Sequence, residues 1–170
     1  DNWAVKGVAH KMKKDGKKHL ITTVIEHHAI LHAMHALEED GFEVTYLPAD
    51  SGGRVRPESV RDALRPDTAM VSVMYANNEL GTIQPVEEIG ALCRKAGVIF
   101  HTDAVQAAGT LPIDVVAQNI DMMSVSAHKF HGPKGVGFLY CRRGLYPDNF
   151  MDGGAQERGH RAGTENVAGI

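Results

Sequence analysis

Regular alternation between short apolar runs and amphipathic segments constrains the fold of this chain more than any other feature. The expected strands are 19–24, 42–47, 69–75 and 98–102, and the expected helices between them are 27–40, 57–64 and 85–96. Units of this kind build a parallel sheet that is covered by helices on both faces. We therefore expect an α/β fold, a three-layer sandwich around a mainly parallel sheet.

Two further apolar runs, 122–126 and 136–141, follow near the end of the sequence. The connection between them is too short for a helical crossover, so these two strands should pair antiparallel. The sheet is thus expected to be parallel except for one strand.

Polar side chains follow four of the expected strands. They are His27, the pair Asn77–Asn78, the segment 103–106 and the pair His128–Lys129. In sheets of this kind, ligands gather at the carboxyl ends of the strands. The sequence therefore predicts one binding site along that rim.

Lys129 lies on the tight connection between the last two strands, after Ser126 and His128. An amine that forms a Schiff base with pyridoxal phosphate needs a partly desolvated position near other cations. Asp103, at the end of an earlier strand, can hold the pyridine nitrogen of that cofactor protonated and so make the ring an electron sink. Lys134 is the competing lysine, but its Gly-Pro-Lys-Gly turn should point to solvent. Asp103 could instead cap a helix, and we expect the two roles to exclude each other.

Five blocks in a fixed order carry a resemblance to a known family. They are Ile25-Glu-His-His-Ala29, Tyr75-Ala-Asn-Asn-Glu-Leu-Gly81, His101-Thr-Asp-Ala-Val-Gln106, Ser126-Ala-His-Lys-Phe-His-Gly-Pro-Lys-Gly135 and Gln156-Glu-Arg-Gly-His-Arg-Ala-Gly-Thr-Glu-Asn166. The chain resembles the cysteine desulfurases of the NifS/IscS class, within the class-V aminotransferases and the fold-type I pyridoxal-phosphate enzymes. The fold that this implies is the large domain of those enzymes.

The resemblance also implies roles for individual side chains. Lys129 would carry the cofactor, and His27 would stack on the cofactor ring and shuttle protons, with His28 as the alternative. Asn78 and Gln106 would bind the phenolic oxygen of the cofactor. The alternative role for Asn78 and Gln106 is ordinary capping of exposed backbone.

The same resemblance assigns the phosphate of the cofactor. Ser126 and His128 would be its ligands, with backbone capping again as the alternative. Thr164 would reach the phosphate of the neighbouring subunit, which implies a homodimer.

The implied reaction removes sulfur from L-cysteine and leaves L-alanine. The sulfur would pass to an enzyme persulfide and then to sulfur-acceptor or iron–sulfur scaffold proteins, for cluster or thiocofactor assembly. Three alternatives stay open: a selenocysteine lyase, which shares all the blocks; the SufS-like subclass, whose loop tends to read Gly-Pro-Thr-Gly where this chain has Gly132-Pro-Lys-Gly135; and a non-catalytic truncated remnant that acts as a dimerisation module.

Compared with this family, residues 1–170 correspond to only part of the large domain. The expected missing parts are a phosphate-binding turn before Asp1 and, after Ile170, the small domain and the catalytic cysteine loop. Cys93 falls on an apolar helix stripe and Cys141 ends an expected buried strand. We therefore expect both to be core cysteines and neither to accept sulfur.

Composition describes an ordinary soluble protein, with a net charge of -3 and two cysteines 48 positions apart. Such sparse cysteines are typical of reduced thiols in a cytoplasmic protein. The basic run 11–18 contains Asp15 and Gly16 and has no interleaved aromatics, so no nucleic-acid partner is expected. No apolar stretch reaches the ~20 residues of a membrane span.

His28, His32 and His35 have the spacing of one helix face and are the best candidate for a metal site. No carboxylate or cysteine completes the set where a fourth ligand would be expected. We expect no metal and interpret the three as a polar helix face.

Overall fold

The computed structural model describes all 170 residues and contains one six-stranded sheet of order β2-β1-β3-β4-β5-β6. The strands are β1 His19–Thr23, β2 Glu43–Leu47, β3 Thr68–Ser72, β4 Ile99–Asp103, β5 Met122–Ser126 and β6 Gly137–Cys141. The helices are α1 Asn2–Lys13, α2 His28–Glu39, α3 Pro57–Ala63, α4 Val86–Ala96 and the single turn α5 Gln156–Gly159, with a 3-10 turn, η1, at Ala127–Lys129. The expected strands and helices are all present, within one to three residues of their predicted ends.

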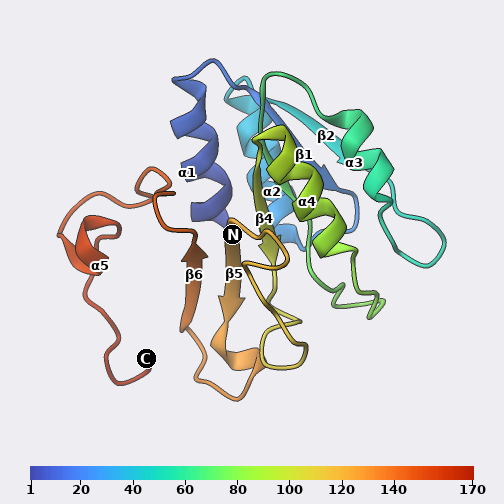
Figure 1. Cartoon of the computed structure of the whole chain (residues 1–170). Helices are drawn as coiled ribbons and strands as arrows, with labels where there is room; N and C mark the ends of the chain where they lie inside the picture. The colour runs from blue at the N-terminus through green and yellow to red at the C-terminus, as the bar shows by residue number, and fades with distance from the viewer.

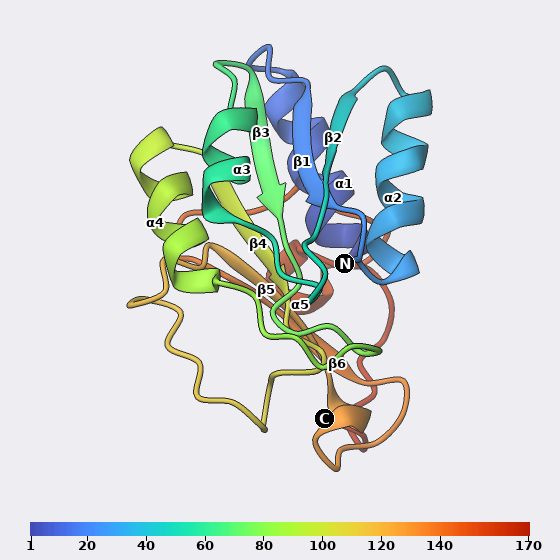
Figure 2. The same cartoon turned by 90° about the vertical axis from the view of Figure 1, so that its right-hand side faces the viewer.

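Helices cover both faces of the sheet (Figures 1 and 2). In Figure 2, α1 and α2 lie on one side of the sheet and α3 and α4 on the other. Each face has its own apolar core: Leu20, Met70 and Met122 pack with the first helix pair, and Ile21, Val71 and Phe100 pack with the second. The three-layer sandwich expected from the sequence is confirmed.

The winding of the sheet reverses between β1 and β3. β1 lies between β2 and β3, all parallel, because the chain crosses to β2 through α2 on one face and returns to β3 through α3 on the other. Connections therefore leave the carboxyl ends of β1 and β3 in opposite directions. Such a switch point opens a crevice where α/β proteins bind their ligands.

β5 and β6 form the only antiparallel pair, as predicted. β6 is an edge strand, and Phe138 on it is 52% exposed. Cys141 on the same strand is only half-buried. The prediction that Cys141 ends a buried strand was wrong, because an edge strand has a neighbour on one side only.

Two buried histidines cross-link the strands through their side chains. The His19 ring bonds Thr68 Oγ1 on β3 and Thr45 Oγ1 on β2, both at 2.8 Å. The His101 ring bonds the Ser72 hydroxyl on β3 and the Ser124 hydroxyl on β5, both at 2.9 Å. Burial lowers the pKa of both rings, that of His101 to about 3, so both are held neutral.

No helix of this fold combines the length and the apolar character that crossing a membrane requires.

Candidate functional site

A cavity of about 320 Å³ lies at the carboxyl ends of β1, β3, β4 and β5. The last residues of β4 and β5 and the short segments that follow the four strands contribute all of its lining residues: His27, Met74, Ala76, Asn78, Asp103, Val105, Gln106, Ser126, His128 and Lys129. The cavity therefore occupies the switch-point crevice, which is where the sequence predicted a binding rim.

Seven of the eight predicted site residues line this one cavity. They are His27, Asn78, Asp103, Gln106, Ser126, His128 and Lys129. The eighth, Thr164, is exposed on the segment that follows α5 and does not reach the cavity. The two competing residues, His28 and Lys134, do not line it either.

Asp103 is the buried carboxylate of the site, with only 6% of its surface exposed. Its Oδ1 accepts a hydrogen bond from the backbone N–H of Val105 at 2.9 Å, and its Oδ2 has no partner within the protein. Burial raises the pKa of this carboxyl, while the Val105 N–H, the amino group of Asp1 and His27 oppose that rise. The cap is therefore present and the carboxylate also lines the cavity, while the expected exclusion between capping and cofactor binding stays a prediction.

His27 sits at the N-terminal end of α2, and its Nδ1 accepts a hydrogen bond from the backbone N–H of Ala29 at 3.1 Å. A neutral ring in this arrangement carries its proton on Nε2. The neighbouring His28 instead stacks on His32, with ring centroids 5.1 Å apart. Of the two histidines that the sequence left as alternatives, His27 lines the cavity and His28 packs against His32 outside it.

The turn η1 contributes two of the lining residues, His128 and Lys129, and Ser126 ends β5 directly before it. Ser126 Oγ and His128 Nδ1 lie 2.7 Å apart, so hydroxyl and ring share one hydrogen bond at the cavity. Lys129 is exposed at the rim rather than partly desolvated as expected, because no other element covers the outer side of this turn.

Close packing fixes the position of η1 against the chain after β4. Gly109 has a φ of +78°, and a Cβ built there would lie 2.6 Å from Cβ of Phe130, the residue after Lys129. Phe130 can therefore approach the backbone only because position 109 carries no side chain.

Glu26 is the residue of the site region to which sequence reasoning gave no role. It is 5% exposed, and its Oε1 accepts hydrogen bonds from the hydroxyl of Thr23 and the backbone N–H of Met74, both at 2.8 Å. The available signal was its place in the block Ile25-Glu-His-His-Ala29, directly before His27. Nothing in the local sequence shows that this carboxyl is buried.

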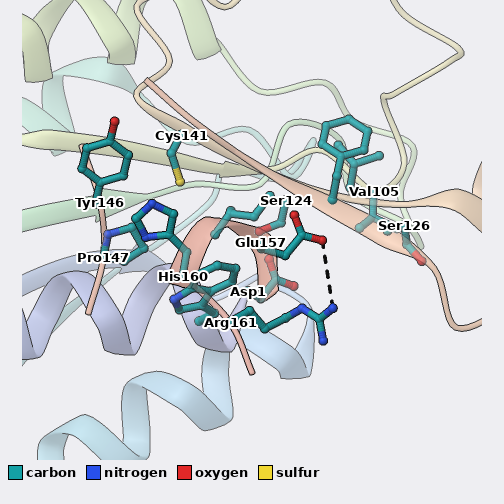
Figure 3. Close-up of a pocket in the computed structure, with 15 residues that line it drawn as sticks. Asp1, Val105, Ser124, Ser126, Cys141, Tyr146, Pro147, Glu157, His160 and Arg161 are labelled. Atoms are coloured by element: carbon teal, nitrogen blue, oxygen red, sulfur yellow. Dashed lines mark ion pairs between the residues drawn. The ribbon is translucent and has the colours of Figure 1, made fainter. Parts of the chain in front are cut away.

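A larger cavity of about 600 Å³ lies beside the first, over β5 and β6 (Figure 3). Cys141, Tyr146 and His160 lie in its wall, and Glu157 and Arg161 form an ion pair there at 4.0 Å. Of the predicted site residues, only Ser126 lines it. We place the functional site in the smaller cavity, where the predicted groups converge.

The two cysteines are free thiols away from the smaller cavity. Cys93 is fully buried in α4, and burial raises the pKa of its thiol to about 12. Burial also raises the pKa of Cys141. No group of three His, Cys, Asp or Glu side chains is arranged to hold a metal ion, and His35 bonds Glu38 instead, at 2.9 Å.

Comparison with known proteins identifies the family. The model of the family described as aminotransferase class-V matches residues 1–170. The chain belongs to the class-V aminotransferases. Among its class-V relatives, the cysteine desulfurase IscS of Clostridium botulinum is 58% identical over 170 residues, which are 100% of this chain and 43% of that protein. The cysteine desulfurase IscS of Methanosarcina thermophila is 57% identical, with 100% and 42% covered. The chain thus spans less than half the length of these curated relatives.

Solved structures agree with this class-V assignment. A NifS-like protein superimposes with a TM-score of 0.94 at 47% identity, over 99% of this chain and 46% of that one. SspA in complex with cysteine gives a TM-score of 0.95 at 44% identity, over 99% and 49%. The resemblance to the NifS/IscS class that the sequence blocks carried is confirmed, and so is the fold.

Proposed function

We propose that this chain is the cofactor-binding part of a pyridoxal-phosphate-dependent cysteine desulfurase, which converts L-cysteine to L-alanine. The observation that carries the proposal is the convergence of a buried carboxylate, Asp103, a rim lysine, Lys129, and the hydroxyl–imidazole pair of Ser126 and His128 on one cavity. The relatives named cysteine desulfurase IscS and the structure of SspA in complex with cysteine support L-cysteine as the substrate.

The residues present fit the cofactor. Asp103 Oδ2 has no hydrogen-bond partner in the protein, and the carboxylate is buried, so a cationic donor in the cavity would offset its loss of water. A protonated pyridine nitrogen is such a donor. Ser126 and His128 would hold the phosphate, Asn78 and Gln106 the phenolic oxygen, and Lys129 the aldehyde carbon. When bound, pyridoxal phosphate supplies an electron sink for negative charge that develops on the α-carbon of an amino acid.

Two side chains of the cavity can move a proton at that carbon. The Lys129 amine and the His27 ring both line the cavity, and His27 is fixed by its bond to the Ala29 N–H. In the net reaction the bond between the β-carbon and the sulfur of cysteine breaks. The sulfur joins a protein thiol as a persulfide, and the β-carbon takes up a proton to become the methyl group of alanine. Cys93 and Cys141 are poor candidates for that thiol, since burial raises both pKa values.

We further propose that the active protein is a homodimer. Thr164 is exposed and outside the cavity, which suits a residue that reaches the phosphate of a neighbouring subunit. Sulfur-acceptor or iron–sulfur scaffold proteins would then collect the persulfide sulfur.

Borohydride reduction tests the lysine assignment. The protein is mixed with pyridoxal phosphate, reduced with borohydride and digested, and mass spectrometry locates the pyridoxyl group. We expect the label on Lys129, with little change in a Lys134→Arg control and loss in Lys129→Arg. A label that stays on Lys134, or that spreads evenly over surface lysines, would contradict the proposed function.

A further inference from the structure

Glu26 fills a gap in the hydrogen bonding of the sheet at its switch point. Pairing between β1 and β3 ends at Ile21 and Val71. Beyond that point, the backbone N–H groups of Val73 and Tyr75 still bond carbonyls of β4, at 3.1 and 2.8 Å. Because successive amides of an extended chain point to opposite sides, the N–H of Met74 faces the side where β1 has ended.

The Glu26 carboxyl supplies the missing acceptor. Its Oε1 accepts from the Met74 N–H and from the hydroxyl of Thr23, the last residue of β1, both at 2.8 Å. A second bond runs parallel to this clamp, from Asn77 Nδ2 to the carbonyl of Ile25 at 2.9 Å. The loop that carries His27 is thereby tied to the segment that carries Met74 and Ala76, and both belong to the cavity wall.

The surroundings of Glu26 favour its neutral form. Its Oε2 is buried without a hydrogen-bond partner, and no ion pair of the structure includes Glu26. The one charged group that acts on Glu26 is Asp103, at the end of β4. Burial raises the pKa of Glu26 to about 8, and Asp103 adds to this, against the bonds from Met74 and Thr23.

We propose that Glu26 is a positioning residue whose neutral carboxyl group holds the His27 loop against the segment after β3 and so fixes two walls of the cofactor cavity. Ionisation of Glu26 would place a second buried negative charge beside Asp103 and loosen the clamp. The role of the cavity in this inference rests on the proposed function, whereas the clamp and its protonation do not.

Stability against pH tests the clamp without any cofactor. A carboxyl whose folded pKa lies above its unfolded value stabilises the fold below the unfolded value, and this contribution is lost as pH rises through the folded value. For wild-type protein, the folding equilibrium constant should fall by at least about tenfold between about pH 5 and about pH 8 through this group alone. Urea unfolding of Glu26→Gln should lack that fall, because the amide keeps the acceptor oxygen but does not titrate. Glu39→Gln, exposed at the end of α2, is the matched control and should follow wild type.

Cofactor binding tests the positioning role. Pyridoxal phosphate is titrated into each variant and followed by its absorbance. We expect Glu26→Gln to bind within about twofold of wild type at neutral pH and to lose the weakening that wild type shows above about pH 8, whereas Glu26→Ala binds at least about tenfold more weakly.

The two measurements separate the two possible failures. If wild type does not bind pyridoxal phosphate yet Glu26→Gln removes the pH dependence of stability, the proposed function fails and the clamp stands. If Glu26→Gln keeps the pH dependence of wild type, the inference about Glu26 is overturned, whatever the cofactor result. Equal cofactor affinity in Glu26→Ala and wild type would also overturn it.

Discussion

Asp103 and Glu26 are buried carboxyl groups at the carboxyl ends of β4 and β1, on either side of β3, and their partners suit them to different roles. Asp103 keeps Oδ2 free on the cavity, where a cationic ligand can pair with it. Glu26 points Oε1 at Met74 and Thr23 and has no cation within reach. Burial raises the pKa of both carboxyls, and His27 opposes that rise for Asp103. Here Asp103 would pair with a cationic ligand, and Glu26 would position the walls of the cavity.

The Asp103→Asn variant tests this division of roles. The amide can still accept from the Val105 N–H, so the fold and its circular dichroism should be unchanged. When the substitution is made in a full-length desulfurase that carries this chain, turnover of L-cysteine should fall by at least about a hundredfold, because a neutral amide cannot stabilise a protonated pyridine in a dry site. Asp114→Asn, at an exposed turn, is the control. Activity near that of wild type in Asp103→Asn would contradict the proposed role of Asp103 in stabilising the protonated pyridine.

At the scale of strands and helices, local sequence patterns predicted the elements but not the side-chain contacts between them. The proline-opened helices at Pro57 and Pro85 and the β-branched strand at His19–Thr23 have strong local signals. The reversal of winding between β1 and β3 has no local sequence signal, because it depends on which face of the sheet each helix packs against. Glu26 was missed for this reason: its burial follows from the reversal. That Asp103 caps the backbone and lines the cavity at once was likewise not visible, since the sequence does not show where the two carboxyl oxygens point.

The histidine cross-link of β3, β4 and β5 gives the sheet a predictable response to acid. A buried His101 whose folded pKa is about 3 stabilises the fold fully above the unfolded value of about 6.5. That contribution is lost as pH falls from there, since the unfolded chain binds a proton that the folded chain refuses. Urea unfolding should show stability falling below about pH 6.5, less steeply in His101→Gln.

His32→Gln, at an exposed position on α2, provides the control for this acid response and should behave as wild type. NMR should show the His101 ring neutral at pH values where exposed rings titrate. A protonated His101 ring in the folded protein near pH 6 would contradict the assignment.

At the scale of the whole molecule, the proposed cofactor cavity and the thiols of the chain lie apart. The smaller cavity is lined by no cysteine, and the larger one beside it includes only Cys141. After incubation with pyridoxal phosphate and L-cysteine, we expect persulfide labelling and mass spectrometry to find no sulfur added to Cys93 or Cys141. The same labelling after deliberate persulfidation of the unfolded chain is the positive control. A persulfide on Cys141 would mean that a thiol on the edge strand β6 can accept the sulfur, against this expectation.

The single antiparallel hairpin has a consequence for how this molecule assembles. Each parallel pairing must wait for a helix-length loop to close, whereas β5 and β6 are joined by a short turn and meet through local contacts. Local hairpins form within microseconds, at about 1–10 μs. The turn that bears Lys129 can thus take shape early, before β1 and β3 have met. Lys129 would then be positioned before the other walls of the cavity form, and the Glu26 contacts between the β1 and β3 segments would be among the last.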